Sequence, residues 1–176
     1  SSDLTAFMPS TTAGANKDAS VDLGHSAVRF KDLYLSGGAY IGGTGSANKL
    51  DDYEEGSWTP QLTGANNISH RAGRYTKIGK QVHLEGEFRC TSYSNSGSTE
   101  VTITGAPFAV GNHSNYNVTG VIFPVNGFNQ SNDHGYTLYC GANGSTWSII
   151  GLNQSTGYNY DYLHRSEMTS GIVEVF

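Results

Sequence analysis

The alternating tyrosines near the C-terminal end have the residue types that a saccharide site needs. In GYNYDYLH, Tyr158, Tyr160 and Tyr162 share one face if the chain is extended, and Asn159 and Asp161 lie on the other. Aromatic faces cover the CH groups of a sugar, while amides and carboxylates bond its hydroxyl groups. An aromatic stripe packs equally well against a sheet or a neighbouring subunit, so both interpretations stay open.

Three polar segments with aromatic residues are predicted to be ligand-contacting loops. They span residues 112–116, 127–133 and 157–161. Binding residues concentrate on loops that a rigid scaffold holds in place. The candidate receptor-binding residues are Tyr116, Asn115, Phe128, Asn129, Tyr158, Asn159, Tyr160 and Asp161. Rigid rings bracketed by hydrogen-bonding side chains suit a saccharide ligand.

The remaining chemistry-bearing residues form no recognised catalytic, metal or phosphate motif. The six histidines include no HxH or HExxH pair, no GxSxG elbow occurs, and the stretch GGAYIGGTGSANKL lacks both phosphate-binding spacings. The acidic cluster at 51–55 offers hard oxygens for Ca²⁺ but lacks the spacing of an EF-hand, and we interpret it as a solvated hinge. We therefore predict a protein that is not an enzyme and has no catalytic residues, metal or cofactor.

Charge and hydropathy exclude two kinds of partner. The formal charge is −5 over 176 residues, whereas a phosphate-binding surface needs an excess of Lys and Arg. We therefore expect no nucleic-acid partner. No run approaches the ~20 apolar residues of a membrane helix, so we expect no membrane insertion. The chain begins with Ser1 rather than Met, and we expect a processed product or a fragment of a longer protein.

The first fifty residues are predicted to form an extended stalk with strands of two to four residues. Residues 1–24 are rich in Ser, Thr, Ala, Gly and Asn, and residues 28–41 alternate only in short pieces. Strands this short are marginal in one chain, so we expect residues 1–50 to intertwine in a homotrimer. Glycines, the acidic cluster and Pro60 predict a hinge at residues 51–60.

Residues 61–176 are predicted to form a β-sandwich head, jelly-roll-like, because strand-like runs alternate with turns. The clearest run is QVHLEGEFRC at 81–90, and Asn126-Gly127 and Asn143-Gly144 are predicted hairpin turns. Cys90 and Cys140 are predicted to be free, buried thiols. The predicted core residues are Val82, Leu84, Phe88, Val101, Ile103, Leu138 and Ile149. The fold class is therefore all-β.

Three blocks of the sequence resemble tail fibres of tailed bacteriophages, especially those of marine and aquatic hosts. The block LGHSAVRFKDLYLSGGAYIGGTGSANKLDDYEEGSWTP at 23–60 resembles a segment of these fibres. GRYTKIGKQVHLEGEF looks like the first strands of the heads that follow it, and ITGAPF at 103–108 looks like a strand-ending turn in them. The resemblance covers about half of the chain. It implies a trimer, a tapering β-structured stalk and a distal head that touches the host surface.

These observations favour an adhesin at the tip of a virion tail fibre, extracellular and joined to upstream fibre or tail proteins. Its expected partner is a host cell-surface glycan or protein receptor, and three weak heads would gain avidity by acting together. The first alternative is a tail enzyme that depolymerises or deacetylates polysaccharide, which usually needs a longer β-helix with paired carboxylates. The second is a structural tip that only nucleates trimerisation.

Overall fold

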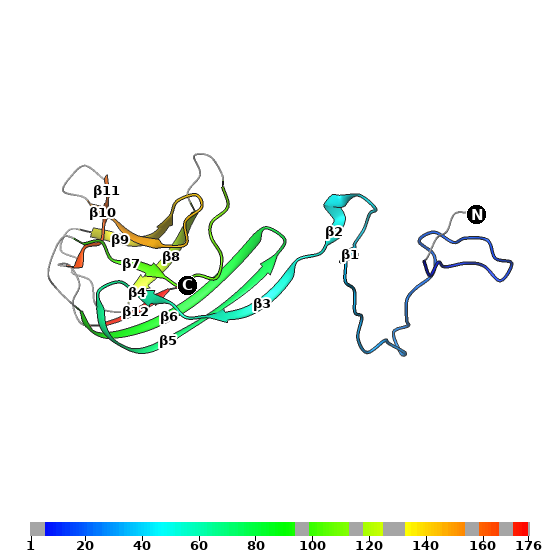
Figure 1. The fold of residues 1–176 in the computed structure, drawn as a ribbon, viewed down its shortest axis with the longest axis horizontal. Helices are drawn as coiled ribbons and strands as arrows, with labels where there is room; N and C mark the ends of the chain where they lie inside the picture. The colour runs from blue at the N-terminus through cyan, green and yellow to red at the C-terminus, as the bar shows by residue number, and fades with distance from the viewer. Residues whose placement is uncertain are drawn as a thin grey trace. The chain divides into compact units, whose positions relative to one another are not determined.

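A computed structural model describes residues 6–93, 99–112, 118–124, 133–153, 159–165 and 171–175. The chain divides into two compact units, Ser1–Ala39 and Tyr40–Phe176 (Figure 1). The structure is nearly all β, and the described residues contain no α-helix; the 3₁₀ turn η1 spans Ser46–Asn48. The predicted all-β class is confirmed.

The first unit consists of turns without a core. The turn between Ser10 and Asn16 is closed by backbone hydrogen bonds and by the Thr11 hydroxyl, which accepts from two backbone amides. A second turn pairs His25 with Val28. No residue of 6–39 is buried. Each turn is stabilised locally, but nothing in the described chain covers the apolar side chains of this unit.

The short strands predicted over residues 28–35 do not form in the single chain. Residues 29–35 form no strand, with a bend at Lys31, and make no backbone–backbone hydrogen bond among the described residues. The reason is physical: an extended segment becomes a strand only when a neighbour pairs with its N–H and C=O groups. Only β1 (Ala39–Tyr40) forms near the predicted runs, and it pairs with β2 (Lys49–Leu50).

The second unit is built from one path of paired strands in the order β3-β5-β6-β12-β8-β9-β10-β7-β4, with β11 pairing β10. All of the pairings along this path are antiparallel. The bounds are β3 (Tyr53–Trp58), β4 (Gln61–Leu62), β5 (Ala65–Ile78), β6 (Gln81–Tyr93), β7 (Thr102–Thr104), β8 (Val118–Pro124), β9 (Asp133–Cys140), β10 (Trp147–Asn153), β11 (Asn159–Tyr162) and β12 (Gly171–Val175).

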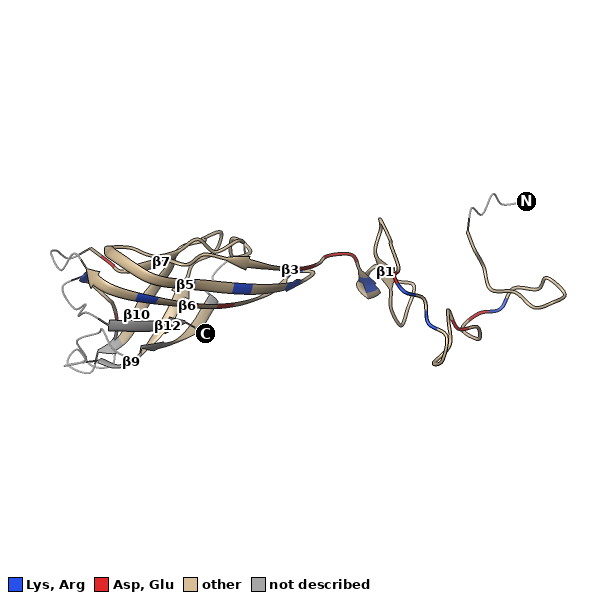
Figure 2. Ribbon diagram, turned by 90° about the horizontal axis from the view of Figure 1, so that it is seen from below, with Lys and Arg blue, Asp and Glu red and all other residues tan. Residues whose placement is uncertain are grey.

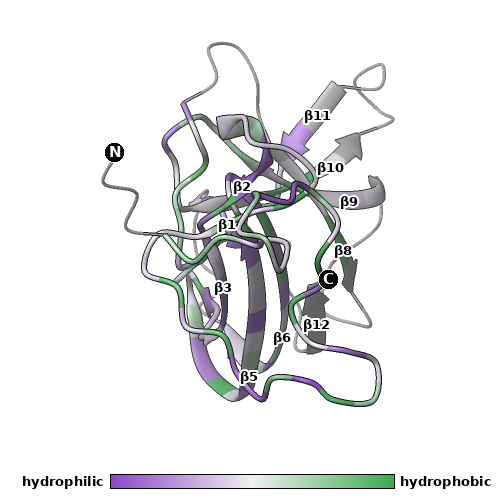
Figure 3. Cartoon of the chain, turned by 90° about the vertical axis from the view of Figure 1, so that its right-hand side faces the viewer, coloured by the Kyte–Doolittle hydropathy of each residue, from purple (hydrophilic) through white to green (hydrophobic). Residues whose placement is uncertain are grey.

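The long β5–β6 hairpin shows how the sequence pattern sets the strand faces. On β6, Gly86, Phe88 and Cys90 are buried, whereas the charged residues between them are exposed. Hydrophilic and hydrophobic residues both occur along β5 and β6 (Figure 3), and basic residues mark both strands (Figure 2). The turn is Gly79-Lys80, with Gly79 at φ +57° as the first position of a type II′ turn requires.

The core draws on both halves of the strand path. Phe88 from β6 meets Ile103 from β7 and Ile149 from β10 in one apolar cluster. Five of the seven predicted core residues are buried, while Val82 and Leu84 are half-buried. Cys90 and Cys140 are both free and buried, as predicted. Asn143 has φ +60° in the turn between β9 and β10, which supports the predicted turn there.

Six residues within the predicted hinge at residues 51–60 form a strand. Tyr53–Trp58 is β3, paired with β5 from Tyr53↔Ile78 to Trp58↔Gly73. The acidic residues hold it there, because Asp52 pairs with Lys77 and Glu54 accepts a hydrogen bond from the Tyr75 hydroxyl. Pro60 is fully buried.

A tryptophan lying on two glycines joins the two ends of the strand path. Trp58 is the last residue of β3, and only Thr59 and Pro60 separate it from β4, at the opposite end of the path. Its indole lies over Gly73 and Gly86, which are cross-strand neighbours on β5 and β6. The indole N–H donates to the Glu85 carbonyl at 2.8 Å. Large side chains would not fit beneath this ring.

We expect Gly86→Ala to destabilise the head by about 1–3 kcal/mol, because the added methyl would lie 2.8 Å from the Trp58 ring. Gly141→Ala is the matched control, since its added methyl meets nothing within 4 Å. Urea denaturation of the two variants measures the difference. Equal stability of Gly86→Ala and wild type would show that the indole does not lie on this glycine.

Candidate functional site

The structure describes only part of the predicted receptor-binding loops. Asp161 is exposed on β11, opposite Gly151 of β10. Asn159 and Tyr160 lie on the same strand in register with Asn153 and Leu152, so residues 159–162 form a strand where a loop was predicted. The candidates that fall outside the described residues are Asn115, Tyr116, Phe128, Asn129 and Tyr158.

One concave feature of the described head is an apolar groove of about 680 Å³. We call it the hairpin groove, because the turn end of the β5–β6 hairpin forms one wall. The segment 108–111 forms another wall, and β8, β9 and β10 contribute to its lining. Its volume is within the roughly 300–1,000 Å³ typical of small-molecule sites. The apolar and aromatic lining residues include Trp58, Val82, Leu84, Ile103, Phe108, Val110, Leu138 and Trp147.

The position of the groove explains why two predicted core residues are only half-buried. Val82 and Leu84 lie in the same strand phase as Phe88, which is fully buried. Nearer the turn, the inner face of the hairpin borders the groove instead of the closed core. Leu84 still packs against the core cluster from one side. The apolar face of the hairpin therefore continues from the core into the groove.

Two contacts fix the ring of Phe108 in its wall. Tyr75 meets it edge to face, with the ring centroids 5.1 Å apart and the planes at 86°. The Lys77 ammonium lies 5.8 Å from its centroid, within the range of a cation–π contact. The hydrogen bond that Tyr75 donates to Glu54 raises the pKa of the Tyr75 hydroxyl, which keeps it protonated as a donor. The aromatic wall is thus held by the same carboxylate that anchors β3.

The wall segment is tied at both ends. Gly105 has φ +92°, and a side chain there would meet the Thr59 carbonyl at 2.5 Å, so this close approach requires glycine. Val110 exchanges two backbone hydrogen bonds with the turn between β9 and β10, at 2.7 Å to Gly144 and 3.0 Å to Asn143. A segment without regular secondary structure is therefore held against the head at defined points.

The mouth of the groove carries more positive than negative charge. Lys77 is paired with Asp52, and Lys80 is exposed at the hairpin turn. Two ammonium groups therefore meet one carboxylate at this site, although the whole chain has a net charge of −5. The groove is a locally basic site in an acidic protein.

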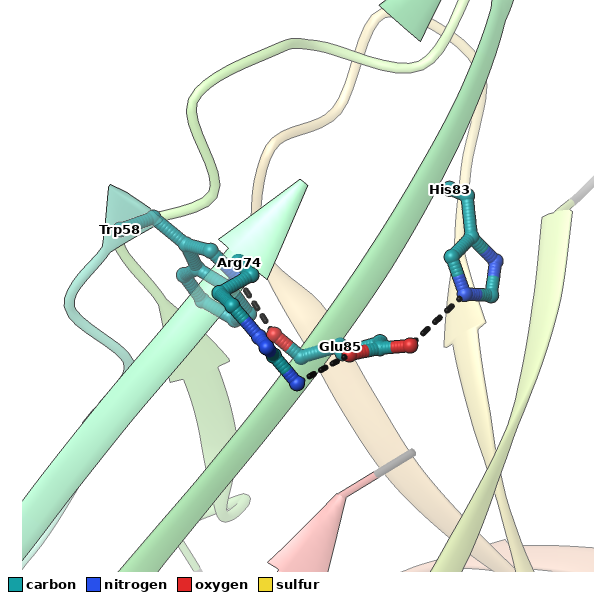
Figure 4. Close-up of polar contacts among 4 residues, drawn as sticks. All are labelled: Trp58, Arg74, His83 and Glu85. Carbon is teal, nitrogen blue, oxygen red and sulfur yellow. Dashed lines mark hydrogen bonds and ion pairs between the residues drawn. The ribbon is translucent and has the colours of Figure 1, made fainter. Parts of the chain in front are cut away.

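A second, smaller hollow of about 350 Å³ lies near a polar cluster on β5 and β6. There the Glu85 carboxylate accepts from Arg74 at 3.2 Å and from His83 at 3.3 Å, while the Glu85 carbonyl accepts from Trp58 (Figure 4). Nearby, His70 contacts Glu87 at 2.6 Å. All of these charged side chains are substantially exposed, so their ion pairs contribute little to stability. These contacts join neighbouring side chains on the exposed face of the hairpin.

Within the described ranges, no three His, Cys, Asp or Glu side chains lie close enough together to hold a metal ion. In the same part of the chain, no helix has the length and apolar character needed to cross a membrane.

Sequence reasoning missed the hairpin groove. Its aromatic residues Phe108 and Trp147 are 39 positions apart, and Lys77 and Leu84 come from a third segment. The segment ITGAPF was interpreted only as a strand-ending turn. No local spacing brings these residues together, because their proximity depends on strand pairings that are distant in sequence.

Comparison of the chain with protein-family models, with curated proteins and with solved structures finds no match in any of the three.

The two tryptophans should differ in their access to solvent. Trp58 is buried with its N–H bonded, whereas Trp147 is half-buried in the groove. We expect acrylamide to quench the fluorescence of the wild type in two components, one for each tryptophan. The Trp147→Phe variant retains only Trp58, and acrylamide should quench its fluorescence much less efficiently. Strong quenching of the remaining Trp58 would contradict the described position of its indole.

Proposed function

We propose that the chain is the distal part of a bacteriophage tail fibre, a homotrimeric and non-enzymatic adhesin located at the fibre tip of the virion. In this proposal residues 1–50 form an intertwined trimeric stalk. The second unit is a sandwich-like, jelly-roll-like head that binds a host cell-surface receptor, a saccharide, to start adsorption. The resemblance of residues 23–60 to fibre segments supports it.

The observation that carries the proposal is the run of uncovered apolar side chains in the first unit. Phe7 is 98% exposed and Tyr34 is 89% exposed. The other large exposed residues of this unit are Met8, Val21, Leu23, Val28, Phe30, Leu33 and Leu35. Soluble chains rarely expose so many apolar residues in series unless a partner covers them. Full burial of each would stabilise an assembly by roughly 1.5–3 kcal/mol.

Identical chains are the partners that best explain this segment. Residues 29–35 make no backbone–backbone hydrogen bond within the described part of the chain and have exposed apolar side chains, so a neighbouring copy could supply both hydrogen bonds and packing. The same segment in each copy would meet the same need, which closed symmetric assemblies satisfy. Three heads on one stalk would then bind weak surface receptors with avidity.

We expect the intact protein to have three times the 18.8 kDa chain mass in solution at micromolar concentration. Replacing Phe30 and Leu33 together by serine should lower the mass toward that of one chain, because two side chains that are each 66% exposed would lose their intermolecular burial. Light scattering coupled to size exclusion measures the mass. The matched control replaces the neighbouring Lys31 and Asp32 by serine. A monomeric wild type would contradict the proposal.

We also expect the intact protein to bind a restricted subset of a panel of bacterial strains. Binding should disappear when the cells are treated with periodate, which oxidises surface saccharides, and should survive treatment with protease. Flow cytometry with labelled protein measures it. Binding to no strain would favour a structural tip, and release of reducing ends or acetate from cell polysaccharide would favour a tail enzyme.

A further inference from the structure

The hairpin groove combines an aromatic lining with unused hydrogen-bonding capacity. Phe108 and Trp147 are both half-buried, so their rings border the groove without being covered. The indole N–H of Trp147 makes no hydrogen bond within the described residues, unlike that of Trp58. Flat rings beside free donors suit a ligand that is apolar on its faces and polar on its edges.

The charged residues of the groove favour a ligand with a negative charge. The lining of the groove includes Lys77 and Lys80 and, as its single acidic residue, Asp52. Lys77 is already paired and its side chain is 18% exposed, so it is fixed in place, whereas Lys80 is exposed and unpaired among the described contacts. A ligand with a carboxylate would find a complementary charge at the mouth and aromatic rings inside.

We propose that the hairpin groove binds a saccharide that carries a carboxylate. The sugar ring would lie against Trp147 and Phe108, and the carboxylate would lie near Lys80 and Lys77. This inference rests on the proposed function, because it names the receptor class of the adhesin and places its site in the groove. It also adds residues to the receptor site that the predicted loops did not include, and the loop 112–116 begins next to the groove wall at Gly111.

A second copy of the chain fits the groove less well than a saccharide. The cores of subunit interfaces are depleted in charged residues, whereas this groove has three charged side chains in its lining. Its volume is that of a small-molecule site. The basic local charge also favours an acidic ligand over a second copy of a chain whose net charge is −5.

The test is a fluorescence titration of the intact protein with a set of acidic oligosaccharides. The set contains glucuronate, galacturonate and N-acetylneuraminate oligomers, each with its carboxyl-reduced counterpart as the neutral control. We expect at least one acidic oligomer to change the Trp147 emission, its reduced counterpart to bind about fivefold or more weakly, and added salt to weaken only the acidic ligand.

Two variants locate the site. Lys80→Glu should weaken the binding of the acidic oligomer about fivefold or more, while Lys17→Glu, which makes the same charge change at an exposed lysine in the first unit outside residues 29–35, should have no effect. Trp147→Phe should abolish the emission change, and isothermal titration calorimetry should show that it binds the acidic oligomer about tenfold more weakly. Lys80 is exposed at a turn, so its replacement remains informative if Trp147→Phe fails to fold.

Several outcomes would overturn the proposal. One is that no acidic oligomer of the set binds. Another is that laurate binds in their place, which would indicate an apolar ligand. Loss of the oligomeric mass in Lys80→Glu would show that the groove is a subunit contact. If the strains are still bound equally by wild type and Lys80→Glu, the proposed function survives and only the groove assignment fails. If no strain is bound at all, the proposed function fails.

Discussion

The packing of Trp58 on Gly73 and Gly86 is the contact on which the head depends most. Trp58 is the last residue of one edge strand, and after two intervening residues the chain begins the strand at the other edge of the path. This contact therefore sets where β4, β7 and the segment after Gly105 lie. The same segment forms the wall of the hairpin groove, so the shape of the candidate site follows from a ring that fits only over glycines.

The two units differ in whether their apolar residues are buried within the single chain. The head buries Phe88, Ile103 and Ile149 in its own core, although the groove and single residues such as Ile78 and Val121 stay uncovered. The first unit buries nothing among residues 6–39 although it contains phenylalanine, leucine and valine side chains. A self-sufficient head on a segment that needs partners is the division of roles expected of an adhesin held at the end of an oligomeric stalk.

The sequence predicted the features that depend on local periodicity. It did not predict features that depend on contacts between residues far apart in the sequence. The alternation of Leu84, Phe88 and Cys90 gave the inner face of β6, and Asn143 was placed in a turn by its tolerance of positive φ. The segment around 53–58 was predicted to be a hinge because the local sequence does not show the partners of its carboxylates. Asp52 pairs with Lys77 and Glu54 accepts from Tyr75, and both partners lie on β5. The groove could not be predicted, since several separate segments form it.

Hydrogen–deuterium exchange of the intact protein tests the central claim, that identical chains complete the first unit, most directly. Residues 29–35 make no backbone hydrogen bonds within the described single chain, so only a neighbouring copy could protect their amides. The account predicts slow exchange in 29–35 at micromolar concentration, with the β5–β6 hairpin as the internal reference for a protected region. Exchange of 29–35 at the rate of an unstructured peptide, while the hairpin stays protected, would contradict it.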